Sequence, residues 1–413
     1  MIRIKKNMEF LQLNSLVKLQ VILVVLCIFC GQSALGAYVP HMMILISAIS
    51  FYFLCDKRIR FKPIYLSRRY GFCLLIALIV LFIGWQVYFV SFNPDRTMVY
   101  FRRYFLYSVF FFFLLKPRSL YVAIKISQGY AILGGVTYLV DTFLNGPSAG
   151  GVFGTYHGAG MMMSVACFMF ATDYFYYRQS RIKLICYLFS LLCVVISTKR
   201  MFMLLSVLGL AIPFVLTSNR AKIRKFFKII SIIIVVGVLA YQLVPQVQNA
   251  FVRFTISFLS DDETISSSGR NILWGMAMEI FNNHKVVGVG FSNFIDYSGS
   301  YYSNPWAGVY HTHGIYYGLL AETGIVGFAL FVTLFVSILV SSLIQLRNVR
   351  KAGQKKYEYL MLHSIALQMW FIIYGFTGNG IYDANEFFLY TVAATIMLSI
   401  KTAIIRGDLE VGS

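Results

Sequence analysis

The sequence predicts an all-α membrane protein that crosses the bilayer about twelve times. Hydrophobic residues make up 59% of the chain and charged residues only 13%, with a mean hydropathy of +0.72. Soluble domains carry about 25% charged residues, roughly twice this fraction. Apolar runs of about 18 residues or more, the length that crosses the hydrocarbon of a bilayer as helix, recur along the whole chain.

The net charge of +20 at pH 7 does not indicate a nucleic-acid partner. The lysines and arginines stand in short clusters between the apolar runs, where the positive-inside rule places them at cytoplasmic helix ends. Such clusters set the topology and contact anionic lipid headgroups. The bilayer is therefore the partner that the charge pattern predicts, and nucleic acid is excluded.

The predicted spans alternate with basic cytoplasmic loops, so both termini are expected in the cytoplasm. The spans cover residues 16–34, 38–55, 71–90, 99–115, 121–144, 155–177, 184–197, 201–217, 229–244, a stretch ending near 346, 360–374 and 387–405. The chain thus divides into residues 1–244 with nine spans, an outer segment over residues 245–310, and residues 311–413 with three spans. We expect an interfacial helix within the outer segment.

Eight basic residues fall on the outer side of this topology, against the positive-inside bias. They are Arg96, Arg102, Arg103, Lys199, Arg200, Arg253, Arg270 and Lys285. One interpretation is that each side chain reaches outward to lipid headgroups. The other is a shared anionic ligand near the outer leaflet, because guanidinium groups bind phosphate oxygens in pairs. A lipid-linked pyrophosphate suits the second interpretation.

The outer segment contains a helical pattern over residues 271–283, preceded by Ser267-Ser268-Gly269 as a candidate N-cap. Trp274 suits a membrane interface. Arg270 stands at the helix N-terminus, where the helix dipole disfavours a cation. The apolar face of this predicted helix is formed by Leu273, Met276, Ala277, Ile280 and Phe281.

The remaining residues of interest are aromatic or histidine. Tyr302 and Trp306 belong to a group of rings that can stack on sugars or sit at the bilayer surface. His311 and His313 lack a third ligand at metal-binding spacing, so no metal and no cofactor are expected. If residues from His313 onward are helical, Tyr316 or Tyr317, Leu320 and Gly324 share its face. His313 is either a structural histidine or a base for a sugar hydroxyl.

His313, followed after Gly314 by nine residues and then Gly324-Ile-Val-Gly327, resembles the signature of bacterial O-antigen ligases and polymerases. Gly151-Val-Phe-Gly, Ser197-Thr-Lys-Arg200 and Gly269-Arg270-x-x-x-Trp274 resemble further parts of the same pattern. The segment Gly288-Val-Gly290, together with Asn293 and Phe294 after it, also resembles a part of this pattern. The sequence departs at Gly314, where the family usually has Asn, Ser or Gln, and at Gly158, where Asn is common.

The resemblance implies a metal-independent, inverting glycosyl transfer at the outer face of the bacterial cytoplasmic membrane. His313 would orient or deprotonate the acceptor hydroxyl, and Arg200 and Arg270 would stabilise the departing undecaprenyl pyrophosphate. Further contacts to substrate are expected from Lys199, Arg102, Arg103, Arg253, His311, Tyr302 and Trp306. A regulator of chain length is a further candidate partner.

Three functions remain open at this stage. The first is a polymerase that joins undecaprenyl-pyrophosphate-linked oligosaccharides into O-antigen, capsular or exopolysaccharide. The second is a ligase that moves finished polymer to a lipid A core, and the third is a flippase for the same lipid-linked sugar. A transporter should place ionisable residues deep within its spans, and Lys125 and Asp141 meet that condition loosely, near helix ends.

Overall fold

The computed structural model describes residues 15–29, 41–46, 71–112, 117–146, 148–177, 181–217, 221–243 and 269–405, with isolated residues between 38 and 49 and between 247 and 255. Every element in these parts of the chain is a helix, which confirms the all-α prediction there. The first elements are α2 (Ser15–Phe29), α4 (Gly71–Phe89), α5 (Pro94–Phe112), α6 (Pro117–Asn145), the 3-10 helix η3 (Gly151–Phe153), α7 (Tyr156–Tyr176) and α8 (Arg181–Ile196). The later elements are α9 (Arg200–Leu208), α10 (Ala211–Leu216), α11 (Lys222–Leu243), α14 (Arg270–Asn283), α15 (Phe294–Tyr301), α16 (Ile315–Lys351), α17 (Lys355–Tyr374) and α18 (Ala384–Ile405).

Among the described helices, Ile315–Lys351 and Ala384–Ile404 are long and apolar enough to cross a membrane by length and composition. The count of twelve spans is therefore not confirmed. The predicted span 201–217 is a helix with a local interruption: α9 ends at Leu208 and α10 begins at Ala211, while Gly209 and Leu210 keep right-handed helical angles. Pro213 explains the break: its ring lacks an N–H and conflicts with the carbonyl of Gly209, four residues earlier.

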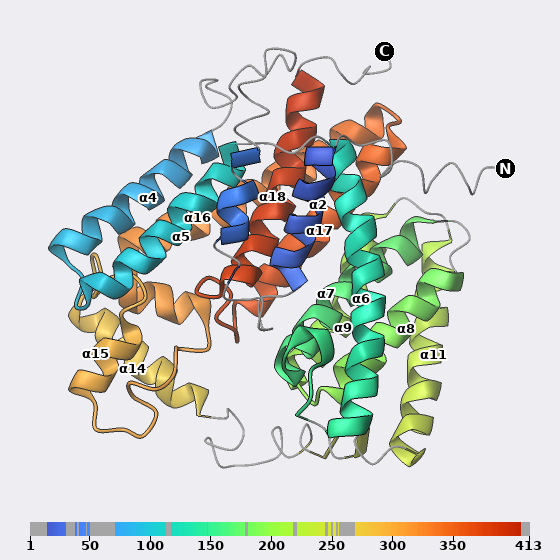
Figure 1. The fold of residues 1–413 in the computed structure, drawn as a ribbon, viewed down its shortest axis with the longest axis horizontal. Helices are drawn as coiled ribbons and strands as arrows, with labels where there is room; N and C mark the ends of the chain where they lie inside the picture. Colours follow the sequence, from blue (N-terminus) through green and yellow to red (C-terminus); the bar gives the residue numbers. More distant parts are fainter. Residues whose placement is uncertain are drawn as a thin grey trace.

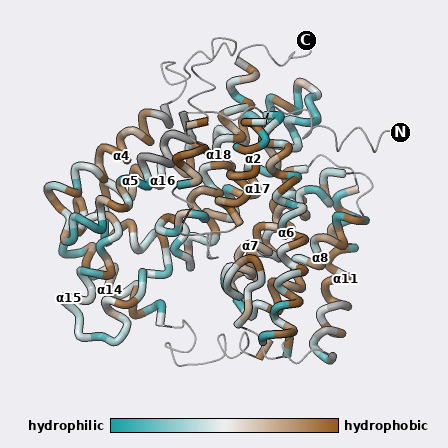
Figure 2. Tube along the Cα trace, in the orientation of Figure 1, coloured by the Kyte–Doolittle hydropathy of each residue, from teal (hydrophilic) through white to brown (hydrophobic). Residues whose placement is uncertain are grey.

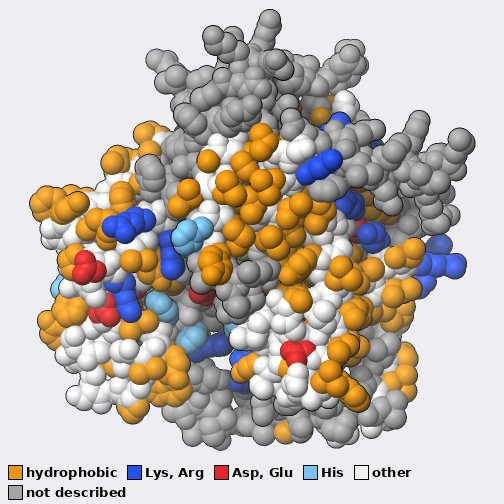
Figure 3. Space-filling view, in the orientation of Figure 1, with side chains coloured by type: hydrophobic (Ala, Val, Ile, Leu, Met, Phe, Trp, Pro, Cys, Tyr) orange, Lys and Arg blue, Asp and Glu red, His pale blue; other side chains and the backbone are white. Residues whose placement is uncertain are grey.

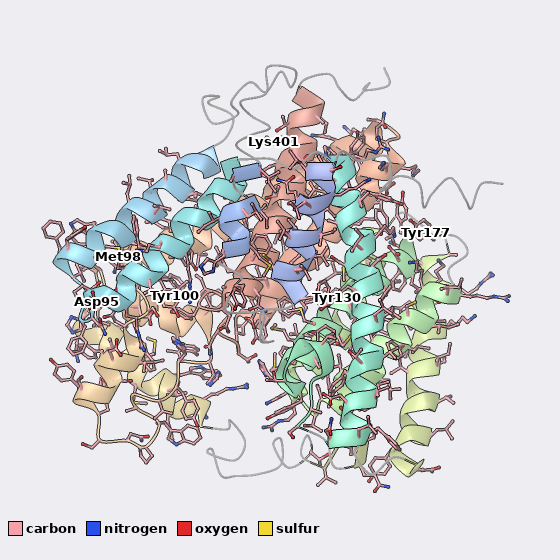
Figure 4. All side chains as sticks on the ribbon, viewed as in Figure 1. Asp95, Met98, Tyr100, Tyr130, Tyr177 and Lys401 are labelled. Atoms are coloured by element: carbon pink, nitrogen blue, oxygen red, sulfur yellow. The ribbon has the colours of Figure 1, made fainter. Side chains whose placement is uncertain are left out.

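The helices form a bundle around α7, with α14 and α15 gathered at one end (Figure 1). From Gly158 to Phe175 every residue of α7 is buried, because α6, α8, α9 and α17 all pack against it. Hydrophobic residues dominate the bundle, while hydrophilic ones are common in α14, α15 and the nearby loops (Figure 2). Tyr177 and Lys401 lie toward the end opposite α14 and α15, whereas Asp95 lies beside them (Figure 4).

The long helix α16 is broken at Gly324, whose φ of 59° and ψ of −165° are not helical. The segment 285–290 runs alongside this break and satisfies the backbone groups that the break frees. Ile325 N–H donates to the carbonyl of Lys285 over 2.8 Å, and Gly290 N–H donates to the carbonyl of Glu322 over 2.9 Å. The break therefore ties the first part of α16 to the segment that follows α14.

Glu322, just before the break, is fully buried and positions α15. Its Oε1 accepts the N–H of Phe294 over 3.0 Å, and its Oε2 accepts the N–H of Ser292 and the hydroxyl of Tyr382, each over 2.7 Å. A carboxylate at a helix N-terminus satisfies free N–H groups there and complements the helix dipole. Glu322 thus joins three segments that are far apart in the sequence.

A second buried acid, Asp173 of α7, ties the bundle together. Its side chain is fully buried, and Lys183 Nζ, Lys125 Nζ and His363 Nε2 lie 2.9, 3.3 and 3.3 Å from its carboxylate oxygens. These partners come from α8, α6 and α17. Lys125, noted above as a candidate transport residue, is therefore engaged in an ion pair that holds helices together.

Replacement of Asp173 by asparagine is expected to lower the free energy of unfolding by about 3 kcal/mol, because it leaves its cationic partners without their buried counter-charge. Thermal unfolding in detergent, followed by circular dichroism, measures this. Asp95→Asn, at an exposed position in the first turn of α5, is the control and should change stability by a few tenths of a kcal/mol. Equal melting temperatures for the two variants would contradict the bridging role.

Candidate functional site

His313 lies in the connection that leads into α16, not on the helix itself. Its φ of 49° is in the left-handed region, which few residues other than glycine adopt. Neighbouring bonds hold this conformation: Thr312 Oγ1 donates to the carbonyl of Gly314 over 2.9 Å, and Ile315 N–H donates to the carbonyl of Gly375 over 2.7 Å. The predicted helical face through His313 is therefore wrong, because the first N–H of α16 bonds to the 375–383 loop.

The surroundings of His313 keep its imidazole neutral. Burial is the main cause, and the charges of Arg270 and Lys199 add to it, so that the pKa of His313 falls to about 4. A neutral imidazole at physiological pH carries one nitrogen lone pair that can accept a proton. Histidine with this protonation state is chemically able to act as a base.

Arg270 is the first residue of α14, and Gly269 is its N-cap, with φ 73°. The cap is therefore Gly269 without a side-chain bond; the serines predicted as caps, 267 and 268, lie outside the described residues. A Cβ at Gly269 would lie 2.8 Å from the Trp306 ring, so only glycine fits there. Burial lowers the pKa of Arg270, yet guanidinium stays protonated in proteins.

Lys199 lies in the short turn between α8 and α9, which packs closely on α7. A Cβ at Gly160 would lie 2.4 Å from Ser197 Oγ, so the small residue lets the turn approach. Lys199 Nζ lies 3.5 Å from the hydroxyl of Tyr156 and 4.6 Å from the centre of its ring. Arg200 begins α9 and interacts electrostatically with Arg270.

Four residues singled out by the sequence are thus brought together from three separate segments: His313, Arg270, Lys199 and Arg200. Each interacts electrostatically with at least one other member of this group. Figure 3 shows histidine and Lys or Arg side chains gathered around a hollow below the centre of this face. We call these four residues the cationic site. In such a group the cations can bind a polyanion, and the neutral histidine can accept a proton from a neighbouring hydroxyl.

Of the other predicted substrate contacts, Arg102, Arg103 and His311 are among the described residues. Arg102 is exposed on α5. Arg103 lies over the Tyr100 ring at 4.9 Å and donates to the carbonyl of Tyr382 over 3.4 Å. His311 stacks on the Tyr382 ring at 5.0 Å, and burial lowers its pKa to about 4. Arg253 lies outside the described residues.

The predicted helix over residues 271–283 is confirmed as α14. Leu273, Met276, Ala277 and Ile280 are buried, and α14 packs on α16. Phe281 is half-buried.

An aromatic row leads from α14 toward His313. Trp306 packs against Tyr310 at 5.4 Å between ring centres, and Tyr310 lies 6.2 Å from the His313 ring. Tyr302 belongs to the same hydrophobic cluster as Trp306. One turn along α14 from Arg270, Trp274 stacks on Tyr317 at 4.9 Å with the rings 13° apart. These faces suit the apolar sides of sugar rings.

Sequence reasoning missed the contribution of the loop 375–383. Asn379 Nδ2 lies 3.3 Å from His313 Nδ1. Asp383 follows in the same loop, and burial raises its pKa to about 6, opposed by the nearby charge of Arg103. Polar residues in a short connection between two apolar helices were the available signal. The approach of Asn379 to His313 depends on the packing of α17 against α16, which the sequence does not display.

A family model described as O-antigen ligase matches residues 185–332, from α8 through the first part of α16. All four residues of the cationic site lie within this match, and Asn379 lies beyond it. No curated protein matches the chain.

Proposed function

We propose that the chain joins oligosaccharide units carried on undecaprenyl pyrophosphate into a polysaccharide, which the match of residues 185–332 to a family model described as O-antigen ligase supports. The reaction takes place at the outer face of the cytoplasmic membrane, and the polymer is an O-antigen, capsular or exopolysaccharide. The observation that carries the proposal is the cationic site, in which the charges of Arg270 and Lys199 act on a histidine whose pKa is about 4 and Arg200 interacts with Arg270.

In the proposed reaction, the hydroxyl of an acceptor sugar attacks the anomeric carbon of the donor. A new C–O bond forms on the side opposite to the departing pyrophosphate, so the configuration inverts. His313 accepts the hydroxyl proton, and the electron pair of the broken C–O bond leaves with undecaprenyl pyrophosphate. Lys199, Arg200 and Arg270 bind the pyrophosphate and stabilise the charge that develops on it. The aromatic row from Trp306 to Tyr310 supports the sugar rings.

A ligase that transfers finished polymer to a lipid A core is the second candidate. The description of the matching family model favours it. The chemistry at the cationic site is identical in the two cases, because both use the same donor linkage and differ in the acceptor.

The test uses purified protein in detergent or nanodiscs with a labelled undecaprenyl-pyrophosphate repeat unit as the substrate. A ladder of products of increasing length on a gel supports the polymerase. Transfer that requires added lipid A core, with no ladder in its absence, supports the ligase. No product under either condition would overturn both and direct attention to translocation of the lipid-linked sugar.

Replacing Arg200 by lysine tests the phosphate contact. Lysine keeps the charge but loses the paired hydrogen bonds of guanidinium, so we expect the rate to fall roughly 10- to 100-fold. The measurement is the initial rate of product formation at fixed donor concentration. Arg224→Lys, at an exposed position of α11, is the matched control and should be close to wild type. A near-normal rate for Arg200→Lys would instead favour an interaction with lipid headgroups.

A further inference from the structure

The side chain of Asn379 is the hydrogen-bond partner of His313. Its amide lies 3.3 Å from Nδ1 of the imidazole. The backbone of Asn379 is held in place, because its carbonyl accepts the N–H groups of Tyr382 and Asp383 over 2.7 and 3.2 Å. The loop itself is tied to the start of α16 through the bond from Ile315 to Gly375. Histidine and asparagine therefore stand on backbones that are fixed relative to each other.

The two orientations of the Asn379 amide have opposite chemical consequences. If Nδ2 donates to the ring, Nδ1 accepts and the ring proton is on Nε2, so the imidazole faces the site as a donor. In that orientation Oδ1 of Asn379 is buried with no hydrogen-bond partner. If the amide is turned over, Oδ1 accepts Nδ1–H and the lone pair of Nε2 is free. Either orientation leaves one amide atom of Asn379 buried without a partner, so the charges around His313 decide between them.

The charges around His313 favour the second orientation. The charges of Lys199, before α9, and Arg270 of α14 lower the pKa of His313. Two further histidines, His157 of α7 and His311, also interact electrostatically with His313. Lysine and arginine are donors only, so an Nε2 lone pair is stabilised beside them, whereas an Nε2–H would face further donors. Among the described residues, Nε2 of His313 has no hydrogen-bond partner in the protein, which leaves it for substrate.

We propose that Asn379 is a positioning residue that fixes the Nδ1–H tautomer of His313 and aims Nε2 at the acceptor hydroxyl. This inference rests on the proposed role of His313 in glycosyl transfer. A hydrogen bond to one ring nitrogen orients a histidine and selects the other nitrogen as the base. An amide does so without adding negative charge, so the imidazole keeps its low proton affinity before the acceptor arrives and regenerates easily after each transfer.

Three variants separate this role from a structural one. Asn379→Ala removes the acceptor, and we expect the rate constant for polymer formation to fall about 10-fold or more with an unchanged KM for donor. Asn379→Asp keeps the acceptor and adds a charge, so activity at neutral pH should be retained. The acid limb of its pH–rate profile should move upward by about one pH unit or more, because a carboxylate favours imidazolium. Asn379→Leu is a control for shape and should behave as the alanine variant does.

Two results with these variants would contradict the proposed role of Asn379. If Asn379→Asp is as inactive as Asn379→Ala, the native amide donates through Nδ2 and the proposed tautomer is wrong. If Asn379→Ala shows wild-type rates and an unchanged pH profile, Asn379 does not position His313. Melting temperatures of all variants in detergent identify any loss of rate that comes from unfolding.

A spectroscopic measurement is independent of activity. In protein labelled with ¹⁵N-histidine, the His313 signals are identified by their absence in His313→Gln. We expect a protonated Nδ1 and an unprotonated Nε2 at neutral pH, with a mixture of tautomers in Asn379→Ala. A protonated Nε2 in the wild type overturns the inference. If the wild type shows the expected tautomer but forms no polymer, the proposed function fails while the pairing of Asn379 with His313 stands.

Discussion

Replacement of His313 by glutamine is expected to lower the rate of polymer formation by about 10²- to 10⁴-fold, the usual contribution of a general base. Glutamine approximates the size of the imidazole but cannot accept a proton near neutral pH. The low pKa of about 4 means that wild-type His313 is already in its basic form at pH 7. Activity of the wild type should therefore stay constant as the pH falls from 7 to about 5.5 and decline below that.

The matched control is His284→Gln at the end of α14. His284 is exposed, and its Nε2 lies 3.0 Å from the hydroxyl of Tyr297, away from the cationic site. We expect this variant to retain nearly full activity. Rates are compared with the labelled lipid-linked substrate after membrane levels of each variant have been equalised. Full activity in His313→Gln would remove the histidine from the reaction and leave it a structural role.

Substitution of Gly324 by alanine should have the largest effect on stability. A Cβ at this position would lie 2.4 Å from the carbonyl oxygen of Val286, and the backbone angles of Gly324 belong to a region that other residues rarely adopt. Backbone strain and the clash together should lower the free energy of unfolding by about 3 kcal/mol or more. The pairing of segment 285–290 with α16 would be disturbed, and activity should fall with it.

Gly353→Ala separates the clash from the strain. Gly353 also has a positive φ, of 65°, but no atom lies within 4 Å of the position that its Cβ would take. This control should cost about 1 kcal/mol from the backbone alone. The measurement is the midpoint of thermal unfolding in detergent for both variants. Similar midpoints would show that the close contact between Gly324 and Val286 contributes little.

The sequence was sufficient for the class of fold and for the members of the cationic site. Apolar runs predict helices because the hydrocarbon of a bilayer requires backbone hydrogen bonds to be satisfied within the segment. Arg200, Arg270 and Lys199 stood out since they violate the positive-inside bias. His313 stood out through the pattern of glycines that follows it. Each of these signals is local in the chain, and the structure places the four residues together.

The same local signals gave a wrong prediction for the segment that leads into α16. The helical period from His313 through Gly324 suggested one continuous face, yet His313 precedes the helix and Gly324 breaks it. The local pattern gave no role to Glu322, although it is fully buried and organises the start of α15. These errors have one cause: the partners of the backbone and of the carboxylate come from segments more than 20 residues away.

What the sequence determined by itself was the type of structure and the chemical inventory: helices that suit a bilayer, cations predicted on the outer side and one histidine marked by the glycine pattern after it. What only the tertiary structure decided was their arrangement, because long-range hydrogen bonds set it. The bond from Ile315 to Gly375 brings Asn379 to His313, and the charges of Arg270 and Lys199 then lower the pKa of that histidine. A pKa depends on burial and on neighbouring charges, and those neighbours are assigned by packing.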